Sequence, residues 1–327
     1  MKALIVGLGS MGKRRIRCLK TLGHEDIVAY DPREDRRAEA ENLYQVKTTD
    51  KLDSAILSKT DVIIISTPPQ HHNQYIKLAI ENKKPAFVEA SVILEGLKEL
   101  EALAKKRMVF IAPSCTLRFH PAIKDIKNIV AGEEYGKVTN FNYHSGQYLP
   151  DWHPWEMVKD FYVGNKETGG CREIIPFELT WLIDVVGFPK KITSLYGKTM
   201  DVGADIDDTY LISMDFNGAF GSMTVDVVSR YALRSLILNM ERGQILWRWD
   251  ETVVKLYDAA NKRWIHYNYP QGQAAGGYNV NIAESMYIEE LGTFIKAANG
   301  ESKWPNPLDE DIKVLELLEE LEGKFKR

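Results

Sequence analysis

Cysteine is scarce in this sequence, with 3 residues in a chain of 327. Cys18, Cys115 and Cys171 are odd in number and far apart, which excludes a disulfide framework and a paired-cysteine metal site. No cluster of His, Cys, Asp and Glu has the spacing of metal ligands, so no metal is expected. Few, unpaired cysteines are typical of a reducing compartment, and we expect a cytoplasmic protein.

Long apolar runs and a strong charge of one sign are also missing. The longest apolar stretches, such as residues 62–65, fall far short of the roughly 20 residues that cross a bilayer, so no membrane span is expected. A glycine loop begins at residue 7, which predicts no signal peptide before it. The net charge is −4, from 42 basic and 46 acidic residues, and this balance argues against a nucleic-acid partner.

What the sequence does contain is a regular alternation of strands and helices over residues 1–113. Short apolar runs predict strands buried on both faces, and the amphipathic stretches between them predict helices. The strands are expected at 3–6, 27–30, 61–66, 86–88 and 108–112, and the helices at 12–22, 73–81 and 94–106. This rhythm predicts an α/β fold whose N-terminal domain is a Rossmann domain with a doubly wound parallel sheet.

Beyond residue 113 the pattern changes to short alternating runs between turn signals such as Asn217-Gly218. We predict a C-terminal α+β domain with an open, mainly antiparallel sheet. The predicted domain bounds are 1–118 for NAD(P) binding and 119–327 for substrate binding and oligomerisation. An open sheet has a flat face that needs covering, so we expect a homo-oligomer, either a dimer or a tetramer.

The first loop of the chain fits the pattern G-x-G-x-x-G between a strand and a helix. Its glycines allow a tight turn, a close approach to a pyrophosphate and close packing of helix on strand, and the helix N-terminus attracts the phosphates. An acid at the end of the second strand binds the ribose hydroxyls, which favours NAD; a nearby arginine leaves NADP open. The loop residues are Gly7, Gly9, Ser10, Met11 and Gly12, the acid is Asp31 and the arginine is Arg33.

Several further segments, spread over nearly the whole length, resemble the glucose–fructose oxidoreductase / inositol 2-dehydrogenase / rhizopine-catabolism family. Thr67, Pro68 and His72 match its T-P-x-x-x-H segment, and Glu89 falls on the glutamate of its E-K-P segment. Arg118 begins an R-F-x-P stretch, residues 134–138 resemble G-x-(I/L)-G-x-V, and 169–170 resemble the glycine pair before the family's catalytic helix. The resemblance implies cofactor contacts by the first group and hydride transfer to or from a sugar, cyclitol or related carbonyl compound.

The sequence departs from that family where the proton is transferred. The lysine of E-K-P is replaced by Ala90, whose side chain can neither donate nor accept a proton. The second family segment, G-G-G-x-x-x-D-x-x-x-H, has no histidine here, and Glu173 and Glu178 fall near its aspartate and histidine.

Glu178 is the first candidate for a replacement proton donor. Burial beside Phe177 and Trp181 would raise the pKa of its carboxyl toward neutral pH. Glu173 and Arg172 are expected to pair with Glu178 or to hold substrate. The alternative is that Glu178 is an acid at a helix start, favoured by the helix dipole.

An aromatic stretch around residues 148–162 is the second candidate substrate site. Flat aromatic rings with a few polar groups suit the apolar faces and hydroxyl rim of a sugar. The candidates are Tyr148, Trp152, Trp155 and Arg118 for substrate contact and His153 as a further proton donor. The alternative is an aromatic loop that packs into the core or a subunit interface.

Three functions remain open from the sequence. The leading hypothesis is an NAD(P)-dependent oxidoreductase for a small carbohydrate-like substrate: a sugar, nucleotide-sugar or cyclitol. The second is a non-catalytic nicotinamide-binding sensor or regulator, which the missing lysine and histidine favour. The third is a reductase of a conjugated substrate that needs no such proton donor.

Overall fold

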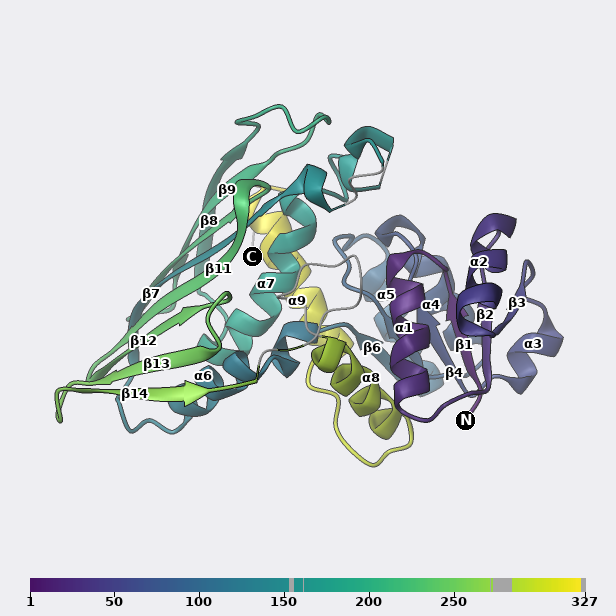
Figure 1. The fold of residues 1–327 in the computed structure, drawn as a ribbon, viewed down its shortest axis with the longest axis horizontal. Helices are drawn as coiled ribbons and strands as arrows, with labels where there is room; N and C mark the ends of the chain where they lie inside the picture. The colour runs from purple at the N-terminus through teal and green to yellow at the C-terminus, as the bar shows by residue number, and fades with distance from the viewer. Residues whose placement is uncertain (153–155, 161, 271, 273–283, 325–327) are drawn as a thin grey trace. The chain divides into compact units, whose positions relative to one another are not determined.

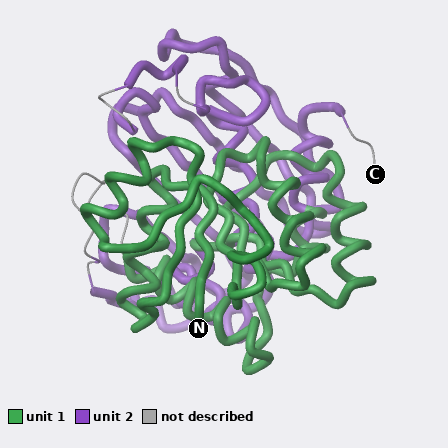
Figure 2. The backbone as a smooth tube through the Cα atoms, turned by 90° about the vertical axis from the view of Figure 1, so that its right-hand side faces the viewer, with its two compact units in different colours: residues 1–116, 284–313 green, residues 117–283, 314–327 purple. Residues whose placement is uncertain are grey.

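The computed structural model describes residues 1–152, 156–160, 162–270, 272 and 284–324. The chain forms two compact units (Figure 2): Met1–Thr116 with Glu284–Lys313, and Leu117–Ala283 with Val314–Arg327. The prediction placed the boundary after residue 118 and assigned everything beyond it to the second domain. The structure groups 284–313 with the first unit instead.

The first unit contains a six-stranded parallel sheet in the order β3-β2-β1-β4-β5-β6 (Figure 1). This is the order of a dinucleotide-binding doubly wound sheet, and the predicted Rossmann fold is confirmed. All residues of β1 and β4 are buried, as the uninterrupted apolar runs predicted. The strands are β1 (Ala3–Val6), β2 (Ile27–Tyr30), β3 (Lys47–Thr49), β4 (Val62–Ile65), β5 (Ala86–Val88) and β6 (Ile111–Pro113).

Helices that are distant in sequence cover this sheet. Helix α8 packs beside α1, and Phe294 of α8 lies edge-on against Phe87 of β5 at 5.7 Å between ring centroids. This aromatic contact is one reason why a late segment belongs to the first unit. The helices are α1 (Ser10–Thr21), α2 (Glu34–Tyr44), α3 (Ser54–Lys59), α4 (His72–Glu81), α5 (Leu97–Arg107) and α8 (Glu284–Ala298).

The second unit is built on an eight-stranded sheet in the order β14-β13-β12-β11-β7-β10-β9-β8. All neighbours are antiparallel except β7 and β10, so the predicted mainly antiparallel sheet is confirmed. The strands are β7 (Val138–Tyr148), β8 (Lys191–Gly197), β9 (Thr209–Asp215), β10 (Phe220–Asp226), β11 (Val228–Met240), β12 (Gly243–Arg248), β13 (Val253–Asp258) and β14 (Arg263–Asn268).

The two faces of this sheet differ. On one face, α7 (Cys171–Val186) contacts β10, and α6 (Pro121–Ala131) contacts α7 and β13. On the other face, Leu195, Leu211 and Phe220 of β8 to β10 are 74%, 48% and 66% exposed. A homo-oligomer that covers this face stays a prediction.

The remaining elements are short or terminal. Helix α9 (Leu308–Leu321) is the last helix among the described residues. Short 3-10 turns lie at 69–71, 116–119, 149–151, 158–160 and 162–164. Within the described ranges, no helix has the length and apolarity needed to cross a membrane.

One helix end offers a test of backbone strain. Met108 caps the C-terminus of α5 with φ +54° and is 92% exposed. A left-handed conformation is strained for any residue with a Cβ and is natural for glycine. We expect Met108→Gly to raise the free energy of unfolding by about 0.5–1 kcal/mol, measured by chemical denaturation. Ala102→Gly, at an exposed interior position of the same helix, is the control and lowers it by about 1 kcal/mol. A loss of stability in Met108→Gly would contradict the strain argument.

Candidate functional site

The glycine loop of the first unit has the shape that a pyrophosphate needs. Gly7 has φ +97°, and a Cβ there would lie 2.6 Å from the carbonyl oxygen of Ser66. A Cβ on Gly12 would lie 1.9 Å from the carbonyl oxygen of Gly7. Gly9 differs, because the nearest atom to its Cβ position is Arg36 Nη1 at 4.0 Å. Gly7 and Gly12 are therefore required by packing, whereas Gly9 keeps space open above the loop.

The N-terminus of α1 lies directly after that space. The helix starts at Ser10. Its N-cap residue is Gly9, which has no side chain to bond the first N–H groups. The first N–H groups of a helix have no partner within the helix, so those of Ser10, Met11 and Gly12 can bind an anion. The loop and the helix start fit the phosphates of a dinucleotide.

Asp31 lies against the same loop. Its carboxylate is 2% exposed and accepts hydrogen bonds from the N–H of Leu8 at 2.8 Å and of Arg33 at 2.9 Å. These two bonds fix the carboxylate at the carboxyl end of β2, where an acid meets the ribose hydroxyls of a bound nucleotide. The negative charge there disfavours a 2′-phosphate.

A second arginine, Arg36, lies near the Asp31 carboxylate, and a cofactor contact of Arg33 stays a prediction. The side chain of Arg33 pairs with that of Asp35, and both are largely exposed. Arg36 comes closer, with Nη1 at 3.7 Å from Asp31 Oδ2 and 4.0 Å from the Cβ position of Gly9. Sequence reasoning missed Arg36 because only the start of α2, at Glu34, shows that this residue points back toward β2.

Thr67, Pro68 and His72 form a braced turn after β4. His72 is 1% exposed, and its Nε2 lies 2.8 Å from the carbonyl oxygen of Thr67. Burial lowers the pKa of His72 to about 4. The neutral ring therefore donates to this carbonyl from Nε2 and holds the turn, as a positioning residue.

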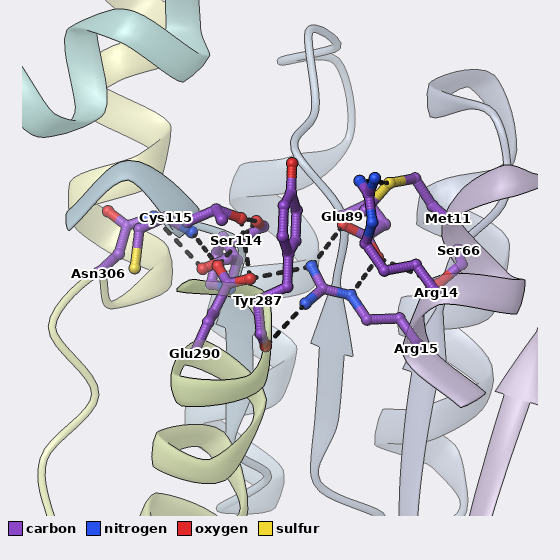
Figure 3. Close-up of polar contacts among 12 residues, drawn as sticks. Met11, Arg14, Arg15, Ser66, Glu89, Ser114, Cys115, Tyr287, Glu290 and Asn306 are labelled. Carbon is purple, nitrogen blue, oxygen red and sulfur yellow. Dashed lines mark hydrogen bonds and ion pairs between the residues drawn. The ribbon is translucent and has the colours of Figure 1, made fainter. Parts of the chain in front are cut away.

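Glu89 is held inside the first unit (Figure 3). Arg15 reaches its two carboxylate oxygens at 2.7 and 2.8 Å, and Ser66 Oγ donates at 3.1 Å. Arg15 Nη2, which bonds Glu89 Oε2, also pairs with Glu290 Oε2 at 2.9 Å. Glu89 thus has a structural role in the described contacts, and its contact with the cofactor stays a prediction.

Glu178 is placed differently from the predicted proton donor. The side chain is fully buried. Helix α7 begins at Cys171, so Glu178 lies within the helix, and the interpretation of this residue as an acid at a helix start is wrong. Its carboxylate accepts from Tyr143 Oη (2.6 Å), Ser145 Oγ (3.0 Å), Trp181 Nε1 (3.0 Å) and Arg234 Nε (2.8 Å). A carboxylate with four donors and no exposed surface fixes α7 to the sheet and has no access to a substrate.

Two arginines predicted to hold substrate are also internal. Arg172 bonds Glu322 at 2.9 Å and Glu319 at 2.6 Å, which ties α7 to the C-terminal residues of the second unit. Arg118 Nε and Nη2 lie 3.0 and 2.9 Å from the carbonyl oxygen of Thr180 in α7. Both side chains are buried and make structural contacts, and substrate contact by either of them stays a prediction.

The aromatic stretch is only partly described. His153 and Trp155 lie outside the described residues. Tyr148, at the end of β7, carries the guanidinium of Arg230 at 3.9 Å from its ring centroid. Trp152 is partly exposed, and its Nε1 is buried without a hydrogen-bond partner in the described part of the chain. Substrate contact by Tyr148 and Trp152 stays a prediction.

Glu173 is the other predicted acid of α7, and its role in proton transfer stays a prediction. Tyr162 Oη donates to Glu173 Oε1 at 2.6 Å, while Oε2 is buried without a partner among the described residues. Burial raises the pKa of the Glu173 carboxyl to about 7, against the lowering effect of the Tyr162 hydrogen bond. Across the described residues, no group of His, Cys, Asp and Glu could hold a metal ion.

Comparisons with known proteins support the assignment of the glycine loop to a nucleotide-binding site. Residues 1–113 match the family described as "Oxidoreductase family, NAD-binding Rossmann fold". An uncharacterized oxidoreductase, YrbE, of Bacillus subtilis is 31% identical over 137 residues, which is 40% of each chain. The D-xylose 1-dehydrogenase (NADP+) of Hypocrea jecorina is 24% identical over 187 residues, 52% of this chain and 47% of that protein. The matched part spans less than half the length of these curated relatives.

A solved structure extends the likeness over the whole fold. An oxidoreductase from Agrobacterium radiobacter, in complex with NAD+, L-tartaric acid and magnesium, superposes with a TM-score of 0.84. The match covers 99% of this chain and 96% of that chain at 13% identity. At this identity the likeness shows the shared fold of both units.

The open space above Gly9 gives the first test of this site. Gly9→Ala keeps the fold, because a Cβ meets nothing closer than 4.0 Å, but the methyl group occupies the space left for the pyrophosphate. We expect the Kd for NAD+, measured by calorimetry, to rise at least about tenfold, which corresponds to about 1.4 kcal/mol. Gly197→Ala is the control, since its Cβ position is also open and it lies in the second unit. Equal Kd values for both variants would contradict the assignment of the loop.

The neutral state of His72 predicts a pH dependence of stability. Its pKa is about 4 in the folded chain and near 6.5 when unfolded. Between these values the unfolded state binds one more proton, so the free energy of unfolding falls as pH decreases from 6.5 to 4, by up to about 1.4 kcal/mol per pH unit. Chemical denaturation at several pH values measures the slope of the free energy of unfolding against pH. In His72→Gln this slope should correspond to one proton fewer than in the wild type. The exposed neighbour provides the control His71→Gln, which should leave the slope unchanged. The same slope in both variants would refute the buried neutral ring.

Proposed function

We propose that the chain is an NAD-dependent oxidoreductase, because residues 1–113 match the family described as "Oxidoreductase family, NAD-binding Rossmann fold". It transfers a hydride between the nicotinamide and a hydroxyl or carbonyl group of a sugar, nucleotide-sugar or cyclitol. The family match confirms the resemblance to the glucose–fructose oxidoreductase / inositol 2-dehydrogenase / rhizopine-catabolism proteins that the sequence suggested.

The observation that carries this proposal is the fixed carboxylate of Asp31 beside an open glycine loop. The hydrogen bond from the N–H of Leu8 holds Asp31 at 2.8 Å from the loop. Gly9 and the start of α1 bind the pyrophosphate, Asp31 binds the adenosine ribose, and the turn braced by His72 completes the site. When bound, the nicotinamide supplies or accepts the hydride. Arg36 partly offsets the charge of Asp31, so NADP is the weaker cofactor rather than an excluded one.

The substrate class is inferred from two kinds of support. The relative from Hypocrea jecorina is named for its action on D-xylose. In this chain, Tyr148 and Trp152 are partly exposed aromatic side chains close in sequence, and the indole N–H of Trp152 is unpaired in the described structure. Rings with a free donor suit the apolar faces and hydroxyl groups of a sugar or cyclitol.

One observation favours a second candidate function. Ala90 occupies the position after Glu89, so the side chain there cannot transfer a proton. Glu178, the first replacement considered, is buried and fully hydrogen-bonded. A nicotinamide-binding sensor without turnover would show these features, and so would a reductase of a conjugated substrate.

A paired measurement tests the proposal. Calorimetric titration with NAD+, NADH, NADP+ and NADPH measures binding, and nicotinamide absorbance measures turnover with sugars, sugar acids, cyclitols and nucleotide-sugars. We expect tighter binding of NAD(H) than of NADP(H) and turnover with at least one carbohydrate class. Asp31→Asn should reduce the preference for NAD(H), because the charge that disfavours a 2′-phosphate is removed. The exposed control Asp26→Asn, directly before β2, should leave it unchanged.

The outcomes separate the candidate functions. Tight binding without turnover on any panel member would reject the carbohydrate oxidoreductase and support the sensor. Turnover confined to conjugated enones or imines would support the third candidate.

A further inference from the structure

We propose that the face of the second sheet opposite α6 and α7 binds a neutral carbohydrate chain across β14, β13, β12, β11 and β7. The proposal goes beyond the hydride transfer proposed above, because this binding needs neither cofactor nor turnover. It is carried by one row of side chains, all in the second unit, that combines aromatic rings with a ladder of amides. The row consists of Trp264, Tyr257, Gln244, Asn239 and Asn140.

The register of the sheet places these five side chains next to one another. Trp264 of β14 pairs with Tyr257 of β13, which pairs with Gln244 of β12. Gln244 also pairs with Asn239 of β11, and Asn239 pairs with Asn140 of β7. Neighbouring strands are about 4.8 Å apart, so the row extends over roughly 19 Å. This length exceeds one sugar ring and suits a chain of several sugars.

The alternation along the strands fixes the face on which the row lies. Leu256, Ile245 and Phe141 each follow or precede a member of the row and are buried, and α6 contacts β13. Because successive side chains of a strand point to opposite faces, the row points away from these helices. Trp264 is 46% exposed on β14, the edge strand in Figure 1. The row is therefore open to a ligand within the second unit.

The aromatic end of the row offers an apolar surface to a sugar ring. The ring centroids of Tyr257 and Trp264 lie 5.2 Å apart, and the ring planes form an angle of 53°. The C–H face of a sugar ring is flat and apolar, so it packs on an indole ring with its hydroxyl groups pointing outward. Trp264 leaves apolar surface in water, and covering that surface is favourable.

The amide part of the row offers fixed hydrogen-bonding groups. Gln244 Nε2 donates to Asn239 Oδ1 at 2.7 Å, and Asn239 Nδ2 donates to Asn140 Oδ1 at 2.8 Å. These bonds set the direction of each amide and use one N–H of each donor, so the second N–H of Gln244 and of Asn239 is available. A hydroxyl group both donates and accepts, and oriented amides can bind the hydroxyls of successive sugars.

The charges beside the row favour a neutral ligand. The two cations on the same face of β12 and β13 are Arg248 and Lys255, and both are paired: Arg248 with Asp250 at 2.8 Å and Lys255 with Glu251 at 2.6 Å. The row itself contains no charged residue. A nucleic acid would need cations to neutralise its phosphates, and an acidic polysaccharide would equally need cations for its carboxylates.

Calorimetric titration with neutral xylo-, manno-, cello- and malto-oligosaccharides tests the proposal. We expect the wild type to bind at least one of these probes with or without NAD+, and Trp264→Ala to raise its Kd at least about tenfold, because the stacking surface is lost. Trp264→Phe keeps a flat ring and should retain most of the affinity. Tyr231→Ala, at a tyrosine that is 62% exposed on β11 outside the row, is the control and should match the wild type.

Two further measurements separate the outcomes. An unchanged Kd for NAD+ in Trp264→Ala shows that the variant is folded, and light scattering gives the oligomeric mass of each variant. Absence of binding to every probe, or equal Kd values for the wild type and Trp264→Ala, would overturn the proposal. A changed mass of Trp264→Ala without oligosaccharide binding would overturn it as well and would identify the row as an interface between copies of this chain. Nicotinamide absorbance decides the proposed oxidoreductase separately, since binding at the row requires no turnover.

Discussion

The buried guanidinium of Arg15 is the interaction on which the first unit depends. Its side chain is fully buried in α1, and a buried cation is tolerated only when it is paired and hydrogen-bonded. Glu89, after β5, and Glu290, in α8, provide the two carboxylates, at 2.7 and 2.9 Å. The ring of Phe87 lies 4.4 Å from the guanidinium carbon. Removal of both acids would leave the guanidinium as an uncompensated charge in the core, and breaking a buried pair in this way costs roughly 3–5 kcal/mol.

The same network explains why residues 284–313 return to the first unit. Glu290 accepts hydrogen bonds from the N–H of Cys115 at 2.7 Å, from Ser114 Oγ at 2.9 Å and from Thr116 Oγ1 at 2.9 Å (Figure 3 shows part of this network). These groups follow β6, the last strand of the sheet. One carboxylate thus joins α8, the end of the sheet and, through Arg15, the helix that carries the nucleotide loop. The sequence of α8 contains no local signal for this, because its partners are more than 170 residues away.

The sequence was most informative where structure is set by neighbours along the chain. The strands with uninterrupted apolar runs and the roles of Gly7 and Gly12 follow from local sterics, and the predicted Rossmann sheet was confirmed. Helix α2 was missed because Ala40 is its one buried residue, so it has no apolar stripe to detect. Glu178, Arg172 and Arg118 show the opposite case: each was interpreted from its own segment, while the structure gives each of them partners from other elements.

Helix geometry accounts for the different positions of the two acids of α7. Glu178 lies five positions after Glu173 in α7. At about 100° per residue, the two side chains point roughly 140° apart around the helix. Glu178 therefore points to the sheet, where β7 and β11 supply three of its four donors. Glu173 points to the segment 162–164, where Tyr162 Oη donates a hydrogen bond to its Oε1. Both carboxylate oxygens of Glu178 accept hydrogen bonds, whereas the donor described for Glu173 bonds Oε1. The two acids of α7 therefore differ in their hydrogen bonds because the two faces of the helix contact different elements.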